Sequence, residues 1–315
     1  MGKAILLAIA ASFCTATSSV CQRLGARDAA TTAGFDIGLI FRLARRPVWL
    51  LGVGSMILGF VFQVTALRYG PLALVQPILA LELIFVFGYM AVIGARRVQR
   101  RDWMAAVAMS AGLGLFLLLA DPSGGQPHAP ARLWWVAGLA TLAAVAAAVA
   151  VASGLGRAAP PAAARRAAIL GAATGAAWGF VAAVIKEFSS HLGDGIGPLA
   201  TNWSPYVLIA VGAATLLLAA QALAAGPLAA SQPGFTILDP LVATLLGIFL
   251  FSENIQASVP RLAGEVVALA ILAAGVSVLS HSHLIVGEHP PPEPPPVPPS
   301  IERPQGHADG ERCRR

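Results

Sequence analysis

Two acidic residues, Glu82 and Asp239, lie near the middle of long apolar stretches of this 315-residue chain. Placing an acidic side chain at the centre of a bilayer costs about 2.5–3.5 kcal/mol on insertion scales, so such residues face protein or a wet cavity. Carboxyl groups in this setting can bind a proton or a cation. The alternative is a structural role, in which each carboxyl group is hydrogen-bonded between helices.

A Gln-Pro pair precedes each acidic residue by about two helical turns, at residues 76–77 and 232–233. Proline removes a backbone hydrogen bond and can kink a helix, and the freed carbonyl group then needs another partner. Pro240 adds a second predicted break. The candidate solute- or proton-binding residues are Glu82, Asp239, Gln76, Gln232, Ser231, Thr236, Trp178 and Ser19, with Pro77, Pro233 and Pro240 as predicted helix breaks. If a cation is carried, Glu82 and Asp239 are its expected ligands.

These residues belong to nine stretches of 18 to 24 residues that are almost free of charge. A bilayer core about 30 Å thick needs roughly 20 apolar residues per helical crossing, and in lipid the backbone must be paired within each segment. The predicted fold class is therefore an all-α polytopic membrane protein. Its predicted spans are Ala4–Gln22, Val48–Leu67, Leu72–Gly94, Trp103–Ala120, Leu133–Ser153, Ala167–Ile185, Pro205–Ala225, Leu228–Phe251 and Leu262–Ser280. The apolar run Phe35–Leu43 reads as an interfacial or re-entrant helix; if it crosses, the spans number ten.

Composition and charge placement agree with a membrane protein. Hydrophobic residues make up 57% of the chain and charged residues 11%, against about 25% charged residues in soluble domains. The arginines lie in short loops rather than in one patch, so no nucleic-acid partner is expected. Sixteen of the 21 Lys and Arg residues fall on the side of the C-terminal tail. This bias predicts a multi-pass plasma-membrane protein with a cytoplasmic C-terminus.

An internal repeat is the most discriminating pattern. Residues 66–77 recur as residues 222–233 with eight of twelve positions identical, including the Gly-Pro and Gln-Pro pairs. The third and eighth spans carry the copies, and an offset of five spans makes them cross in opposite directions. This predicts an inverted-topology repeat, the architecture that supports alternating access around a midplane site. The predicted organisation is a transmembrane domain over 1–281, with repeats at 4–120 and 167–280 and a linking helix at 133–153, then a disordered proline-rich tail at 282–315.

The order of several short motifs resembles the drug/metabolite transporter superfamily, which includes EamA-type exporters. It is most similar to the NIPA-like magnesium transporter branch, which has nine predicted spans. The motifs are SFCTATSSVCQRLG at 12–25, GPLALVQP at 70–77, WGFVAAVIK at 178–186, QAL at 221–223, SQP at 231–233 and FSE at 251–253. This resemblance implies a membrane transporter for a small solute or for magnesium.

The leading hypothesis is a secondary transporter that works by alternating access. Magnesium prefers six oxygen ligands, and the carboxylates, glutamines and freed carbonyl groups could hold a partly hydrated ion. The same groups could serve proton-coupled export of a metabolite or drug, so both solute classes remain open.

A non-transporting structural subunit is the alternative from another class. No HExxH, GxSxG or phosphate-loop motif is found, so neither an enzyme nor a cofactor is expected. The oligomeric state stays open.

Weaker patterns concern packing and helix ends. Three glycines of the sixth span predict close helix packing, and a polar stripe on the first helix predicts either cavity lining or packing. These residues are Gly171, Gly175 and Gly179, and Ser12, Thr15, Ser19 and Gln22. Lys186 and Glu265 are predicted to lie near membrane interfaces, with a gate role as the alternative for Lys186.

Overall fold

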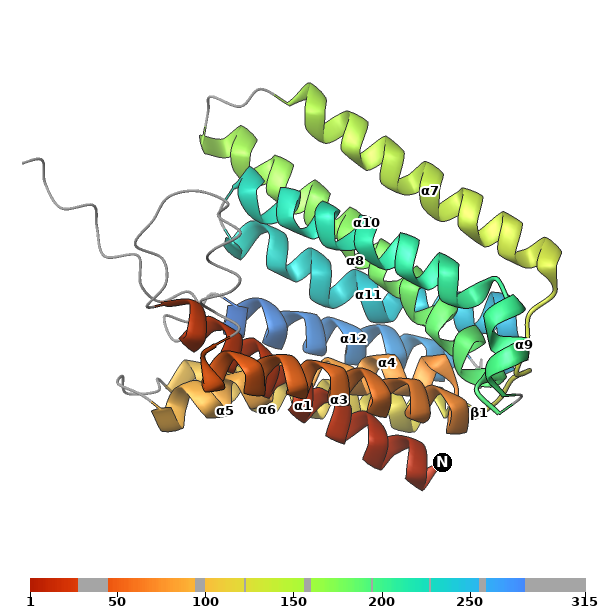
Figure 1. The fold of residues 1–315 in the computed structure, drawn as a ribbon. Helices are drawn as coiled ribbons and strands as arrows, with labels where there is room; N and C mark the ends of the chain where they lie inside the picture. The colour runs from red at the N-terminus through yellow and green to blue at the C-terminus, as the bar shows by residue number, and fades with distance from the viewer. Residues whose placement is uncertain are drawn as a thin grey trace, which may run out of the picture.

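A computed structural model describes residues 1–27, 45–93, 100–121, 123–155, 160–193, 195–226, 228–254 and 259–280. The chain forms a bundle of long helices that lie roughly along one axis, with a pair of very short strands at one end (Figure 1). The elements are α1 (Gly2–Arg27), α3 (Pro47–Tyr69), α4 (Leu72–Leu79), α5 (Glu82–Ile93), α6 (Arg100–Ala120), β1 (Ser123–Gly124), α7 (Ala131–Gly154), α8 (Pro160–His191), α9 (Ile196–Thr201), α10 (Ser204–Ala225), α11 (Leu228–Phe251), β2 (Glu253–Asn254) and α12 (Val259–Ser280).

Seven helical segments are long and apolar enough to cross a membrane within the described residues. They are Gly2–Gln22, Pro47–Tyr69, Leu72–Ile93, Trp103–Ala120, Ala131–Gly154, Ala162–His191 and Ser204–Ala225. Shorter apolar helices occupy Ile237–Phe251 and Ala263–Gly275. This confirms an all-α polytopic membrane protein. Helix occurs in each of the nine predicted ranges, but nine crossings stay a prediction, and both Phe35–Leu43 and the tail lie outside the described residues.

The outer surface of the bundle is apolar. In α7 only 11% of the most apolar stretch is buried, and Leu139 and Leu142 are among its exposed side chains. Helices α3 and α10 likewise expose large hydrophobic side chains, such as Ile57 and Ile209. A helix that is apolar on all sides yet barely buried by protein is suited to lipid rather than to water.

The two helices that carry the repeated motif differ in continuity. The third span is split: α4 ends at Leu79, two residues after Pro77, and α5 begins at Glu82. By contrast, α11 is one continuous helix through Pro233 and Pro240, so the helix breaks predicted there are wrong. A proline removes only one donor from the backbone ladder, and the remaining hydrogen bonds carry α11 through both positions.

The same two helices run in opposite directions where they meet. Glu253, just after the end of α11, accepts hydrogen bonds from the backbone N–H groups of Leu72 and Ala73 at the start of α4. The end of α11 therefore lies beside the beginning of α4, while Asp239, earlier in α11, interacts through charge with Glu82, which follows α4. This is the direction that an inverted repeat requires, although the equivalence of the two halves stays a prediction.

The tightest helix packing is between α8 and α11. Gly171 faces the backbone of Ser231, Gly175 faces Gly234, and Gly179 faces Asp239. The glycines thus follow α11 in order, so α8 and α11 run in the same direction. This confirms the packing role predicted for the three glycines, because a larger residue would push the two backbones apart.

A methyl group at Gly179 should destabilise the protein. Its Cβ would lie 2.8 Å from the carbonyl oxygen of Asp239 and 2.9 Å from the Ala243 nitrogen. We expect Gly179→Ala to lower the free energy of unfolding by about 1–3 kcal/mol, measured in mixed detergent micelles. Gly212→Ala in α10 is the matched control, because nothing lies within 4 Å of its added Cβ. Equal stability of the two variants would contradict close packing at Gly179.

Candidate functional site

Glu82 is placed by the break in the third span. It is the first residue of α5, and its half-buried side chain accepts a hydrogen bond of 2.9 Å at Oε1 from the hydroxyl group of Ser19 in α1. The break puts this carboxyl group at the amino end of a helix, where unpaired N–H groups and the helix dipole favour an anion. The structure therefore brings together two of the predicted site residues.

Asp239 lies in the middle of α11, and its charge and that of Glu82 are close enough to interact. Its Oδ1 atom is buried and has no hydrogen-bond partner among the described residues. A buried acceptor without a partner costs about 1–3 kcal/mol, so its retention asks for an explanation, and a binding role supplies one. The two carboxyl groups come from helices that run in opposite directions.

The backbone before the break is held by α1. The Ser12 hydroxyl lies 2.8 Å from the Ala8 carbonyl oxygen and 3.0 Å from the Ile78 carbonyl oxygen, and these two acceptors share its one hydrogen. The polar stripe of α1 therefore contacts the interrupted span on both sides of the break, through Ser12 before it and Ser19 after it. Gln76 is buried in α4, and its Nε2 atom has no hydrogen-bond partner within the described part of the chain.

The remaining predicted residues have other surroundings. Ser231 is fully buried against Gly171 of α8, and Trp178 is partly buried against the central hydrophobic cluster. Gln232 and Thr236 belong to α11, but their side chains lie outside what the structure describes. The described part of the candidate site is therefore the acidic pair with its hydroxyl donor from α1.

Glu265 lies deeper in its helix than the sequence predicted. Helix α12 begins at Val259 rather than at Leu262, so Glu265 lies nearly two turns inside the helix, and it is buried. Its Oε1 atom has no hydrogen-bond partner among the described residues, while Arg261, one turn earlier, interacts with it through charge.

Lys186 is buried within the protein and paired with an acidic residue. Its side chain is 8% exposed and forms an ion pair with the Glu253 carboxylate, which is fully buried. The ammonium nitrogen also lies 4.6 Å from the centroid of the Phe251 ring, within range of a cation–π interaction. An isolated buried charge is very costly. The buried Lys186 ammonium group is tolerated because the Glu253 carboxylate neutralises its charge.

The Glu253 carboxylate joins three helices. Besides Lys186 of α8, it accepts hydrogen bonds of 2.6 Å from the Leu72 N–H and 2.9 Å from the Ala73 N–H. These are donors that the first turn of α4 leaves without an intrahelical acceptor. Sequence reasoning noted Glu253 and Lys186 as parts of separate motifs, but nothing in their spacing indicated that they pair.

A described surface hollow lies away from the acidic pair. It is lined by residues of α8 and α10, namely Ala163, Arg166, Gln221, Ala224 and Ala225. These residues lie at the beginning of α8 and the end of α10, well removed in both helices from the middle of the bundle. The hollow therefore does not add ligands to the acidic pair.

Comparison with known proteins places the chain beside one curated relative. It is 27% identical over 254 residues to an uncharacterised protein of Corynebacterium glutamicum, a match that covers 80% of this chain and 86% of that protein. No family model matches the chain. No solved structure matches it either.

Replacing Glu253 should lower the free energy of unfolding more than replacing Lys186 does. Glu253→Gln leaves the Lys186 ammonium group buried without a counter-charge, a loss of about 3–5 kcal/mol in unfolding free energy. In Lys186→Met the carboxylate keeps its two N–H donors, so a smaller loss is expected. The double variant should recover part of the loss because neither charge is then stranded. Strictly additive effects, measured in mixed micelles, would show that the two side chains are not coupled.

Proposed function

We propose that this chain is a plasma-membrane secondary transporter that moves a small solute by alternating access. The observation that carries the proposal is the pair of acidic residues at mid-span, Glu82 and Asp239, on two helices that run in opposite directions. Inverted repeats build their binding sites at this position, from helices that are interrupted near the middle of the bilayer. The motif resemblance to drug/metabolite transporters supports the same function.

The acidic pair favours a cationic solute or a coupled proton. Two carboxylates whose charges interact in a poorly solvated site repel each other, and a bound cation or proton removes that repulsion. The Oδ1 atom of Asp239 accepts no hydrogen bond from the described residues, so it is available to bind a cation. We therefore propose magnesium or another divalent cation as the first solute to test. Proton-coupled export of a small metabolite or drug is the alternative that the same pair supports.

The interruption between α4 and α5 is the proposed hinge of the transporter. At the break, the Ala80 N–H donates to the Pro77 carbonyl at 3.2 Å and the Leu81 N–H donates to the Ile78 carbonyl at 3.0 Å. These are turns of three residues rather than four, so the regular helix ladder is interrupted there. Helix α4 is held at its start by Glu253, whereas α5 begins beyond the break. In this proposal, α5 pivots about residues 80–81 and carries Glu82 towards one side of the membrane or the other.

Neutralising either member of the pair should stop transport without unfolding the protein. We expect Glu82→Gln and Asp239→Asn each to reduce magnesium uptake into proteoliposomes by about tenfold or more, because a charged ligand contributes on the order of 1.5–3 kcal/mol. Uptake would be followed with an entrapped magnesium indicator, with and without a pH gradient. Glu265→Gln is the matched control, a buried carboxyl group outside the pair, and should keep wild-type flux.

Two outcomes would contradict this proposal. Wild-type flux in both Glu82→Gln and Asp239→Asn would remove the acidic pair from the mechanism. A wild-type protein that moves neither magnesium nor protons nor a panel of metabolites would favour a structural subunit. Uptake that requires a pH gradient and ignores magnesium would favour proton-coupled export.

A further inference from the structure

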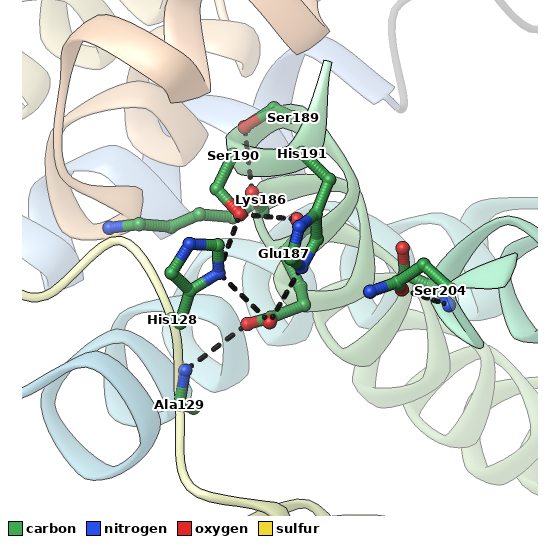
Figure 2. Close-up of polar contacts among 9 residues, drawn as sticks. His128, Ala129, Lys186, Glu187, Ser189, Ser190, His191 and Ser204 are labelled. Atoms are coloured by element: carbon green, nitrogen blue, oxygen red, sulfur yellow. Dashed lines mark hydrogen bonds and ion pairs between the residues drawn. The ribbon is translucent and has the colours of Figure 1, made fainter. Parts of the chain in front are cut away.

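Another polar cluster, shown in Figure 2, lies at the end of the bundle that carries the strand pair in Figure 1. It consists of Glu187 and His191, one turn apart at the end of α8, and His128 from the segment that leads into α7. Each residue offers one ligand atom, and these three atoms lie within 4.8 Å of one another. The acidic pair and its proposed transport role do not account for this cluster.

The spacing of these atoms fits a transition metal. The Glu187 Oε1 atom lies 3.3 Å from His128 Nδ1 and 3.5 Å from His191 Nε2. Zinc binds imidazole nitrogen and carboxylate oxygen at about 2.0–2.2 Å in tetrahedral geometry, which separates neighbouring ligand atoms by roughly 3.3–3.5 Å. Two of the three edges of such a site are therefore already formed. Two imidazoles with one carboxylate suit zinc and its neighbours better than magnesium, which prefers oxygen.

The surrounding contacts hold the ligands in place and leave the site open. The Ala129 N–H donates to Glu187 Oε2 at 3.2 Å, which leaves Oε1 directed towards both imidazoles. The Ser190 hydroxyl donates to the Glu187 carbonyl at 2.6 Å and lies 3.0 Å from His128 Nδ1, within hydrogen-bond distance of that ligand atom. The Glu187 side chain is 5% exposed, His191 20% and His128 47%, so an ion can enter from the His128 side.

We propose that His128, Glu187 and His191 form a binding site for a divalent transition metal, with zinc as the best fit and water at the fourth position. The site fixes the segment before α7 to the last turn of α8. Such a link has a structural purpose here, because α7 is mostly exposed to lipid and is held by few buried side chains. The arginine distribution predicts that this end of the bundle faces away from the cytoplasm, so the metal would come from outside the cell.

Zinc binding by the full chain in detergent tests this proposal directly. The protein would carry an affinity tag without histidine, be stripped with a chelator, and be titrated with Zn²⁺ against a fluorescent zinc indicator. We expect one site per chain, with affinity reduced by at least about 10–100-fold in His128→Gln and in His191→Gln, the range found for outer-shell partners alone. Zinc should also raise the thermal unfolding temperature of the wild type and leave that of both variants unchanged.

The matched control removes two histidines elsewhere in the chain. His281 and His283 follow α12 in the sequence and lie outside the described residues, and they could bind zinc by themselves. The His281→Gln/His283→Gln variant should keep both the affinity and the thermal shift. Zinc binding that survives in His128→Gln and His191→Gln but is lost in this control would overturn the proposal, as would a wild type that binds no zinc. His128→Gln is the decisive variant, because its half-exposed side chain can be replaced with little effect on folding.

Discussion

The buried carboxylate of Glu253 is the interaction on which the arrangement of the helices depends. It lies just beyond the end of α11, accepts two N–H donors from the first turn of α4, and pairs with Lys186 of α8. Three helices that are far apart in sequence are thereby held at one point. Because the group is fully buried, its charge is balanced only by these partners, and none of the three helices can move away without exposing an unpaired charge or donor.

Because of this constraint, the two halves of the interrupted third span are held differently. Helix α4 is held at its start by Glu253, and the Ile78 carbonyl near its end accepts a hydrogen bond from Ser12 of α1. Helix α5 begins after the break with Glu82, whose side chain accepts a hydrogen bond from Ser19 of α1. One half of the span is thus anchored by a buried ion pair, while the other half is held by uncharged contacts with α1, including a 2.7 Å hydrogen bond between Thr17 and Tyr89 and the packing of Phe13 on Phe85. The facing helix α11, which carries Asp239, is continuous.

Sequence patterns predicted the helices well because the membrane imposes a simple rule on them. Each apolar stretch of sufficient length must form a helix, and the structure has helix in every predicted range. The third span is interrupted at residues 80–81, after Pro77. The breaks predicted at Pro233 and Pro240 were wrong, because a proline weakens a helix locally, and neighbouring helices decide whether it ends. The close packing of α8 on α11 supports that stretch.

By itself, the sequence determined that the protein is all-α and that it belongs in a membrane, and it predicted that Glu82 and Asp239 lie at mid-span. These conclusions depend on the composition and length of continuous segments, which local physics controls. Only the tertiary structure decided that Lys186 pairs with Glu253, that Ser19 donates a hydrogen bond to Glu82, and that His128 contacts Glu187 at the end of α8. Those contacts join residues more than 55 positions apart, so they depend on how the helices pack and not on any spacing along the chain.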